Sequence, residues 1–244
     1  MRNNFSIINV HKKNNTKSEV VTQLLFGETF TKLKRNGSWI KIKNDKDGYV
    51  GYIKNKKFSS NLKNTHKVYN LFSTIYSKPL SNYKTRKKLS FGSEIKVLEK
   101  KDKFYKFDNL WIKKKDLKKI NFSSRNIFNN AIKFINVKYK WGGKYYNGID
   151  CSALVQLCLN NNQKFCPRDT KDQIKFFKNK ISLKNLRKND LIFWKGHVAI
   201  VISKTKLIHA YGPLKRVIIA PIKKTIDKIY KTANLKVIGA RRLR

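Results

Sequence analysis

The stretch YKWGGKYYNGIDCSALVQLCL, from Tyr139 to Leu159, decides how the second half of the chain is interpreted. After Cys151, apolar residues recur at the third, fourth and seventh positions, which is the spacing of one helix face. Because Gly148 eases a turn just before it, we expect Cys151 in the first turn of that helix. Unpaired backbone N–H groups at a helix start favour an anion, which for a cysteine is the thiolate. On this stretch alone, a buried structural cysteine remains an equal alternative.

Two histidines favour a catalytic cysteine. His197 and His209 begin and end consecutive predicted strands, in KGHVAIVI and LIHAYGP. A thiol nucleophile needs a base within hydrogen-bond reach, and the base needs a third group that holds its ring. In an antiparallel pair, the two histidines share a face only if an odd number of residues connects the strands. A three-residue loop, Ser203–Thr205, would set His209 opposite Ala199 and bring the two rings together.

Residues 123–244 are predicted to form helices followed by an antiparallel sheet. Ser123 or Ser124 can cap a first helix, the second begins at Cys151, and Thr170 with Gln173 resembles a capping box for a third. Five strand-like runs follow: DLIFW, HVAIVI, KLIHAYG, RVIIAPI and KVIGARR. This order is typical of an α+β fold.

The first half contains a weak internal repeat. FGETFTKLKRNGSWIKI (Phe26–Ile42) aligns without gaps on FGSEIKVLEKKDKFYKF (Phe91–Phe107). Alternating apolar residues, short runs and Gly, Asn and Asp turns predict two small antiparallel β-barrels. We therefore expect three domains, at residues 1–66, 67–122 and 123–244.

The composition is strongly basic. Lys and Arg number 57 against 14 Asp and Glu, a formal net charge of +43. Such an excess is typical of partners such as nucleic acid, anionic membranes or acidic polymers. The basic residues are scattered through every segment, as compositional drift would also leave them, so no nucleic-acid partner is expected.

The cysteine spacing indicates whether a metal site or disulfides are expected, and the apolar runs indicate where in the cell the protein is expected. The three cysteines contain no C-x-x-C pair, so neither a zinc site nor a disulfide framework is expected, and free thiols fit a reducing compartment. No run is long enough to span a membrane, and the N-terminus has no signal-peptide core. We expect a cytoplasmic protein, and the cell envelope stays open if the N-terminus is trimmed or export is non-classical.

Four motifs together resemble those of the NlpC/P60 cysteine peptidases, in the same order and context. They are YKWGGKYYNGIDCSALVQ, CPRDTKDQ, NDLIFWKGHVAIV and LIHAYG. The family has papain-like α+β domains that cleave peptidoglycan peptides. The resemblance covers about residues 123–244, and the N-terminal half resembles tandem bacterial SH3-like domains. The chain is most similar to the branch of γ-D-glutamyl-L-diamino acid endopeptidases, also called dipeptidyl-peptidase VI.

The resemblance implies roles for individual residues. The family's nucleophile falls on Cys151, its general base on His197 and its orienting group on His209. No metal or organic cofactor is implied. Ala153 stands where the family usually has Gly, and further departures from the family pattern fall on three other positions: Asn136, Lys138 and Asn189. None removes a group that the mechanism requires.

The same branch binds the free N-terminal amine of its substrate, a peptide that begins L-Ala-γ-D-Glu-diamino acid. The matching positions in this chain are Asp150, Ser152, Thr170 and Tyr49. A carboxylate and hydroxyls suit an ammonium group and exclude chains with a blocked N-terminus. The alternative is that Asp150 and Thr170 are plain helix caps.

Other functions stay open at this point. One is a non-catalytic wall-binding or polymer-binding protein that works through its SH3-like half, and another is a basic nucleic-acid binder. An amidase or acyltransferase on the same thiol scaffold is a third, because a fold does not fix the reaction. The sequence does not decide between diaminopimelate and lysine, between muropeptide recycling and wall remodelling, or between oligomeric states.

Overall fold

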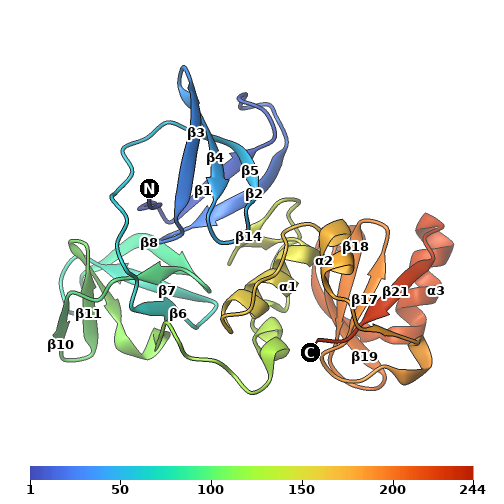
Figure 1. Ribbon diagram of the computed structural model, residues 1–244. Coiled ribbons are helices and arrows are strands. Elements are labelled where there is room, and N and C mark those ends of the chain that lie inside the picture. The colour runs from blue at the N-terminus through green and yellow to red at the C-terminus, as the bar shows by residue number, and fades with distance from the viewer. Residues whose placement is uncertain (244) are drawn as a thin grey trace. The chain divides into compact units, whose positions relative to one another are not determined.

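The computed structural model describes residues 1–243 and is divided by its contacts into two compact units (Figure 1). The first contains Met1–Phe122 and Gly142–Tyr146, and the second contains Ser123–Trp141 and the residues from Asn147 onward. Residues 142–146 fall within the predicted domain 123–244, whereas their contacts place them in the first unit.

The first unit begins with a five-stranded antiparallel sheet. Its strands are β1 (Ile7–His11), β2 (Val20–Leu25), β3 (Phe30–Asn36), β4 (Trp39–Asn44) and β5 (Val50–Lys54), in the order β2-β1-β5-β4-β3. Alternate residues of these strands point to one side and form an apolar core. That core contains Ile8, Val10, Leu24, Phe30, Ile40, Ile42 and Ile53.

The rest of the first unit contains two more sheets. The larger consists of β7 (Phe72–Tyr76), β8 (Lys84–Ser90), β10 (Glu99–Lys101), β11 (Phe104–Phe107) and β12 (Leu110–Lys113), in the order β10-β11-β12-β7-β8. The smaller consists of β6 (His66–Val68), β9 (Glu94–Ile95) and β13 (Leu117–Lys119), in the order β13-β6-β9. A 3-10 turn, η1 (Lys114–Asp116), precedes β13, and β14 (Lys144–Tyr145) lies in the inserted segment.

The predicted internal repeat has a structural counterpart in its turns. Gly27 and Gly92, which the alignment matches, both have positive φ, at 84° and 83°. The matched Phe26 and Phe91 that precede them are both buried. Each sheet nevertheless ends in two edge strands, so no closed barrel is present among the described residues, and the two predicted barrels are not confirmed.

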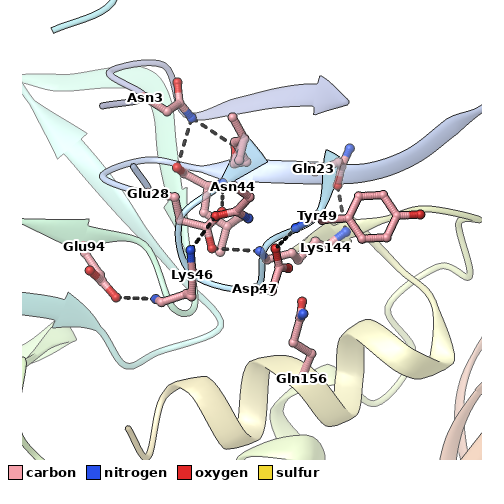
Figure 2. A network of polar contacts seen from close by, with 12 residues as sticks. Asn3, Gln23, Glu28, Asn44, Lys46, Asp47, Tyr49, Glu94, Lys144 and Gln156 are labelled. Atoms are coloured by element: carbon pink, nitrogen blue, oxygen red, sulfur yellow. Dashed lines mark hydrogen bonds and ion pairs between the residues drawn. The ribbon is translucent and has the colours of Figure 1, made fainter. Parts of the chain in front are cut away.

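Ion pairs and a shared core join these sheets into one unit. Phe26, which directly follows β2 of the first sheet, packs in a core whose other members come from residues 68–117. Figure 2 shows the ion pair of Lys46 with Glu94, at 2.5 Å, and Arg2 pairs with Asp108 at 2.9 Å. The boundary expected between residues 66 and 67 stays a prediction.

The second unit combines helices with a six-stranded sheet. Its sheet has the order β16-β21-β17-β18-β19-β20. The strands are β16 (Lys180–Ile181), β17 (Leu191–Trp194), β18 (His197–Val201), β19 (Lys206–Tyr211), β20 (Arg216–Pro221) and β21 (Val237–Arg241). The α-helices are α1 (Cys151–Asn160), α2 (Thr170–Phe176) and α3 (Ile222–Ala233). Three 3-10 helices are also present: η2 (Ile127–Phe134), η3 (Leu183–Asn185) and η4 (Gly212–Leu214). The short strand β15 (Gly148–Ile149) precedes α1.

The second unit departs from the predicted order in two places. The segment expected to be its first helix is the 3-10 helix η2, and α3 lies between β20 and β21, where no helix was predicted. Ile222 and Ile229 of α3 complete an apolar cluster with Trp194 and Val201 of the sheet, which accounts for the helix there. Among residues 1–243, no helix has the length and apolarity needed to cross a bilayer.

Candidate active site

Cys151 is the first residue of α1, as the sequence predicted. Asp150 is the N-cap, and its Oδ1 accepts a hydrogen bond of 2.8 Å from the Ala153 backbone N–H. This bond satisfies one of the N–H groups that have no partner within the helix. The cap therefore fixes the start of the helix directly beside the cysteine sulfur.

The two histidines lie as the predicted register requires. Ile200 pairs with Ile208 and Val201 with Leu207, and the Ile202 backbone N–H donates to the Lys206 carbonyl at 3.0 Å, so the turn consists of the three residues Ser203–Thr205. The same register sets His209 opposite Ala199. The rings meet directly: His197 Nε2 lies 2.9 Å from His209 Nδ1. His209 also stacks on Tyr211, with ring centroids 4.7 Å apart.

Burial keeps both imidazoles neutral. It lowers the pKa of His197 to about 4, and burial together with the neighbouring His197 lowers the pKa of His209 to about 3. In a neutral pair, a single hydrogen lies between His197 Nε2 and His209 Nδ1. When His197 Nε2 carries that hydrogen and donates it, His197 Nδ1 has no hydrogen and is the basic atom. His209 then carries its hydrogen on Nε2, which is buried without a partner among the described residues.

The Cys151 sulfur is held by backbone groups on both sides of His197. It lies 4.0 Å from the Gly196 carbonyl oxygen and accepts from the Val198 backbone N–H. Thr170, the first residue of α2, adds a side-chain hydrogen bond to the sulfur. These contacts bring the nucleophile candidate to the start of β18, where the candidate base is located.

The resting form of Cys151 differs from the expected thiolate. Burial, and next the charge of Asp150, raise the pKa of the Cys151 thiol to about 11. Burial disfavours the charged form of any ionisable group, and here it outweighs the helix N-terminus. The resting site is therefore a neutral thiol beside a neutral imidazole.

Arg168, for which the sequence predicted no role, binds two of the residues predicted to recognise the substrate amine. Its Nη1 and Nη2 donate to Asp150 Oδ1 and Oδ2, at 3.0 and 2.5 Å, and Nη1 donates to Ser152 Oγ at 2.8 Å. The arginine is 3% exposed. Its signal in the sequence was an Arg within CPRDTKDQ, in a chain whose bases are mostly Lys, since Arg is the residue suited to bidentate carboxylate binding.

The predicted capping box at α2 is wrong. Asp169, not Thr170, is the N-cap, and neither residue makes a side-chain cap bond there. Gln173 instead donates through Nε2 to the carbonyls of Ser152 and Pro167, both at 2.9 Å. Gln173 therefore ties the turn that carries Arg168 to the first turn of α1.

Tyr139 is a second residue that received no predicted role. Burial, and then the nearby Cys151 and Asp150, hold the pKa of its phenol well above the usual range. Its hydroxyl is therefore a neutral donor near the thiol. Its backbone N–H donates to the Lys215 carbonyl at 2.8 Å, which fixes the start of the decisive stretch.

Tyr49 lies in the first unit, directly before β5 (Figure 2). Its backbone N–H donates to Asp47 Oδ1 at 3.0 Å, and its carbonyl accepts from the Asn44 N–H at 2.9 Å. Its contact with the substrate stays a prediction. All three cysteines are free thiols, and no cluster of three or more His, Cys, Asp or Glu side chains within residues 1–243 could hold a metal ion.

Comparison with known families agrees with this geometry. Residues 136–235 match the NlpC/P60 family, and residues 10–58 match the bacterial dipeptidyl-peptidase Sh3 domain. The chain carries an NlpC/P60 peptidase domain. These matches confirm the resemblance of the C-terminal half to NlpC/P60 domains and the presence of an SH3-like domain at residues 10–58. The second SH3-like domain, expected at residues 67–122, stays a prediction.

Individual relatives extend the NlpC/P60 match. The chain is 26% identical over 238 residues to the gamma-D-glutamyl-L-lysine dipeptidyl-peptidase of Bacillus subtilis (strain 168). This match covers 86% of the present chain and 79% of the Bacillus subtilis protein. It is 35% identical over 85 residues to the dipeptidyl-peptidase 6 of Lysinibacillus sphaericus, a match that covers 35% of this chain and 31% of that protein. The crystal structure of an NlpC/P60 family protein from Bacillus cereus ATCC 10987 covers 99% of this chain and 98% of its own, with a TM-score of 0.83 at 20% identity, and so shares the fold.

Proposed function

We propose that this protein is a cysteine endopeptidase that hydrolyses the γ-D-glutamyl–diamino acid bond of peptidoglycan-derived peptides with a free N-terminal L-Ala. The observation that carries the proposal is the 2.9 Å bond between His197 Nε2 and His209 Nδ1, together with the contacts of the Cys151 sulfur to the two residues that flank His197. The similarity to the Bacillus subtilis dipeptidyl-peptidase over 86% of this chain supports the choice of bond.

The catalytic cycle follows from the neutral resting pair. As the sulfur of Cys151 attacks the γ-D-glutamyl carbonyl carbon, the thiol proton passes to His197 Nδ1, and His209 holds the resulting imidazolium through its Nδ1. The Cys151 backbone N–H, at the helix start, is the proposed donor to the developing oxyanion. The C–N bond then breaks as His197 returns the proton to the leaving amine, and water hydrolyses the thioester.

We propose that substrate selection depends on the free amine. Asp150 Oδ2 accepts one hydrogen bond from a described residue, that of Arg168, so a carboxylate lone pair remains for an ammonium donor. Asp150 and Thr170 are thus proposed to serve both as structural residues and in recognition, together with Ser152 and Tyr49. An acetylated N-terminus lacks the charge and two of the donors, and its binding leaves the remaining lone pair of Asp150 Oδ2 without a donor.

The test is hydrolysis of L-Ala-γ-D-Glu-L-Lys and of L-Ala-γ-D-Glu-diaminopimelate, followed by mass spectrometry of the released L-Ala-γ-D-Glu dipeptide. We expect turnover of at least one peptide by the wild type and none by Cys151→Ala, because no other group replaces the nucleophile. Cys158→Ala, in the same helix, is the matched control and retains activity. Cleavage by Cys151→Ala would refute a thiol mechanism, and unchanged cleavage of the N-acetylated peptide would refute the amine site.

A further inference from the structure

Asp150 poses an electrostatic problem at this site. It is the N-cap of α1 and therefore directly precedes Cys151 in the chain. An Asp at this position stabilises the start of a helix. A fixed carboxylate beside a thiol, however, opposes the negative charge that the sulfur must carry during attack.

Arg168 is placed to offset part of that opposition. Its guanidinium binds both carboxylate oxygens of Asp150, at 3.0 and 2.5 Å, and the Ser152 hydroxyl at 2.8 Å. The side chains of the pair are 1% and 9% exposed, so water and salt screen their charges little. Both charges therefore act on the sulfur through the protein interior, with opposite signs.

We propose that the Arg168 guanidinium partly offsets the charge of Asp150 beside the Cys151 sulfur, so that Asp150 caps the helix of the proposed nucleophile with less opposition to ionisation of the thiol. Arg168 is thus a charge-balancing residue that also holds the Asp150 carboxylate in position. The directions of the two effects agree with this, since Asp150 raises the pKa of the Cys151 thiol and Arg168 lowers it.

Other titratable groups also face the sulfur or its partners. His197 comes from β18, His209 from β19, and Tyr139 from the segment before α1. Burial keeps all three neutral near pH 8. Asp150 and Arg168 are thus the charged residues in this set, which allows their balance to be tested by substitution.

The assay is alkylation of Cys151 by iodoacetamide at pH 8.5, with the modified peptide quantified by mass spectrometry so that Cys158 and Cys166 do not contribute. The sulfur–carbon bond forms, iodide leaves and the thiol proton goes to solvent. Below the thiol pKa, the rate follows the thiolate fraction, reduced by the lower nucleophilicity of a more acidic thiol. A rise of about one unit in the pKa therefore slows alkylation about threefold.

Four proteins make the test: the wild type, Arg168→Gln, Asp150→Asn, and the double variant. Asn caps a helix about as well as Asp, so Asp150→Asn removes the charge and keeps the cap. We expect Arg168→Gln to react about threefold more slowly than the wild type, Asp150→Asn to react faster, and the double variant to return to within about twofold of the wild type. Arg168→Lys retains the positive charge but cannot donate to both Asp150 oxygens in the geometry of a guanidinium. Its alkylation rate should lie between those of the wild type and Arg168→Gln.

If Arg168 only held Asp150 in position, without an electrostatic effect on the sulfur, the alkylation rates would follow a different pattern. Removing both partners would then impair the site at least as much as removing Arg168 alone, and a double variant as slow as Arg168→Gln would overturn the proposal. An unchanged rate in Arg168→Gln would overturn it too. If Arg168→Gln does not fold, as judged by circular dichroism, a rate in Asp150→Asn at or below that of the wild type is the overturning result. Because alkylation needs no substrate, this outcome is independent of the proposed peptidase specificity.

Discussion

Lys144 and Glu28 form an ion pair of 2.7 Å whose side chains are 0% and 1% exposed. The Lys144 backbone N–H also donates to Gln23 Oε1 at 2.7 Å, and Glu28 accepts from the Leu25 N–H at 3.0 Å. Lys144 is separated from Cys151 by only six residues in the sequence, yet it belongs to the first unit. The pair thus anchors the segment of residues 142–146 within the first unit (Figure 2).

Substituting one partner of the Lys144–Glu28 pair should strongly lower the free energy of unfolding. Lys144→Met or Glu28→Gln leaves one buried polar or charged group without its partner, and we expect the free energy of unfolding to fall by about 3–5 kcal/mol. Urea denaturation of the full chain measures this. The matched control is Lys106→Met, which breaks the exposed pair with Glu99 and should change stability by less than about 1 kcal/mol. Equal effects of the two substitutions would contradict a dominant role for the buried pair.

His209 should act as a hydrogen-bond acceptor for His197 rather than as an acid or base. His209→Asn, whose side-chain carbonyl can accept from Nε2, should retain much more activity than His209→Leu, which cannot. We expect kcat to fall about tenfold or more further in His209→Leu than in His209→Asn, because the imidazolium formed during attack loses its partner. Steady-state hydrolysis of the tripeptide measures the difference. Equal kcat values in the two variants would show that the acceptor is not needed.

The sequence predicted where Cys151 and the two histidines lie because local rules determine their positions. Helical spacing after Cys151 and the parity of the loop at Ser203–Thr205 are short-range properties, and the structure has both. The Arg168–Asp150 pair and the assignment of Lys144 to the first unit join residues far apart in sequence. No periodicity encodes such pairs, so sequence reasoning missed them. The thiolate expectation was wrong for a related reason, since burial depends on the whole fold.

The two histidines should make the folded state sensitive to acid. Their pKa values are about 4 for His197 and about 3 for His209 in the folded state, below the ordinary 6.5. The unfolded chain therefore binds protons at higher pH than the folded chain, and stability is lost as the pH falls from about 6.5 towards 4. We expect the loss across this range to be smaller in His209→Asn than in the wild type. Urea titrations at pH 7 and pH 4.5 measure it, and equal losses in both proteins would contradict the assignment.

Gly27 should tolerate no side chain, for two separate reasons. Its φ is +84°, and a Cβ built there would lie 1.9 Å from the Glu94 carbonyl oxygen, a backbone atom that cannot move aside cheaply. Gly37 provides the matched control, because its φ is +54° and a Cβ added there would have nothing within 4 Å. Gly37→Ala introduces only the backbone strain, about 1–2 kcal/mol, whereas Gly27→Ala adds a clash and should destabilise the first unit by at least about 2 kcal/mol more. Urea denaturation of both variants measures the difference, and similar stabilities would show that the turn at Gly27 can move away from Glu94.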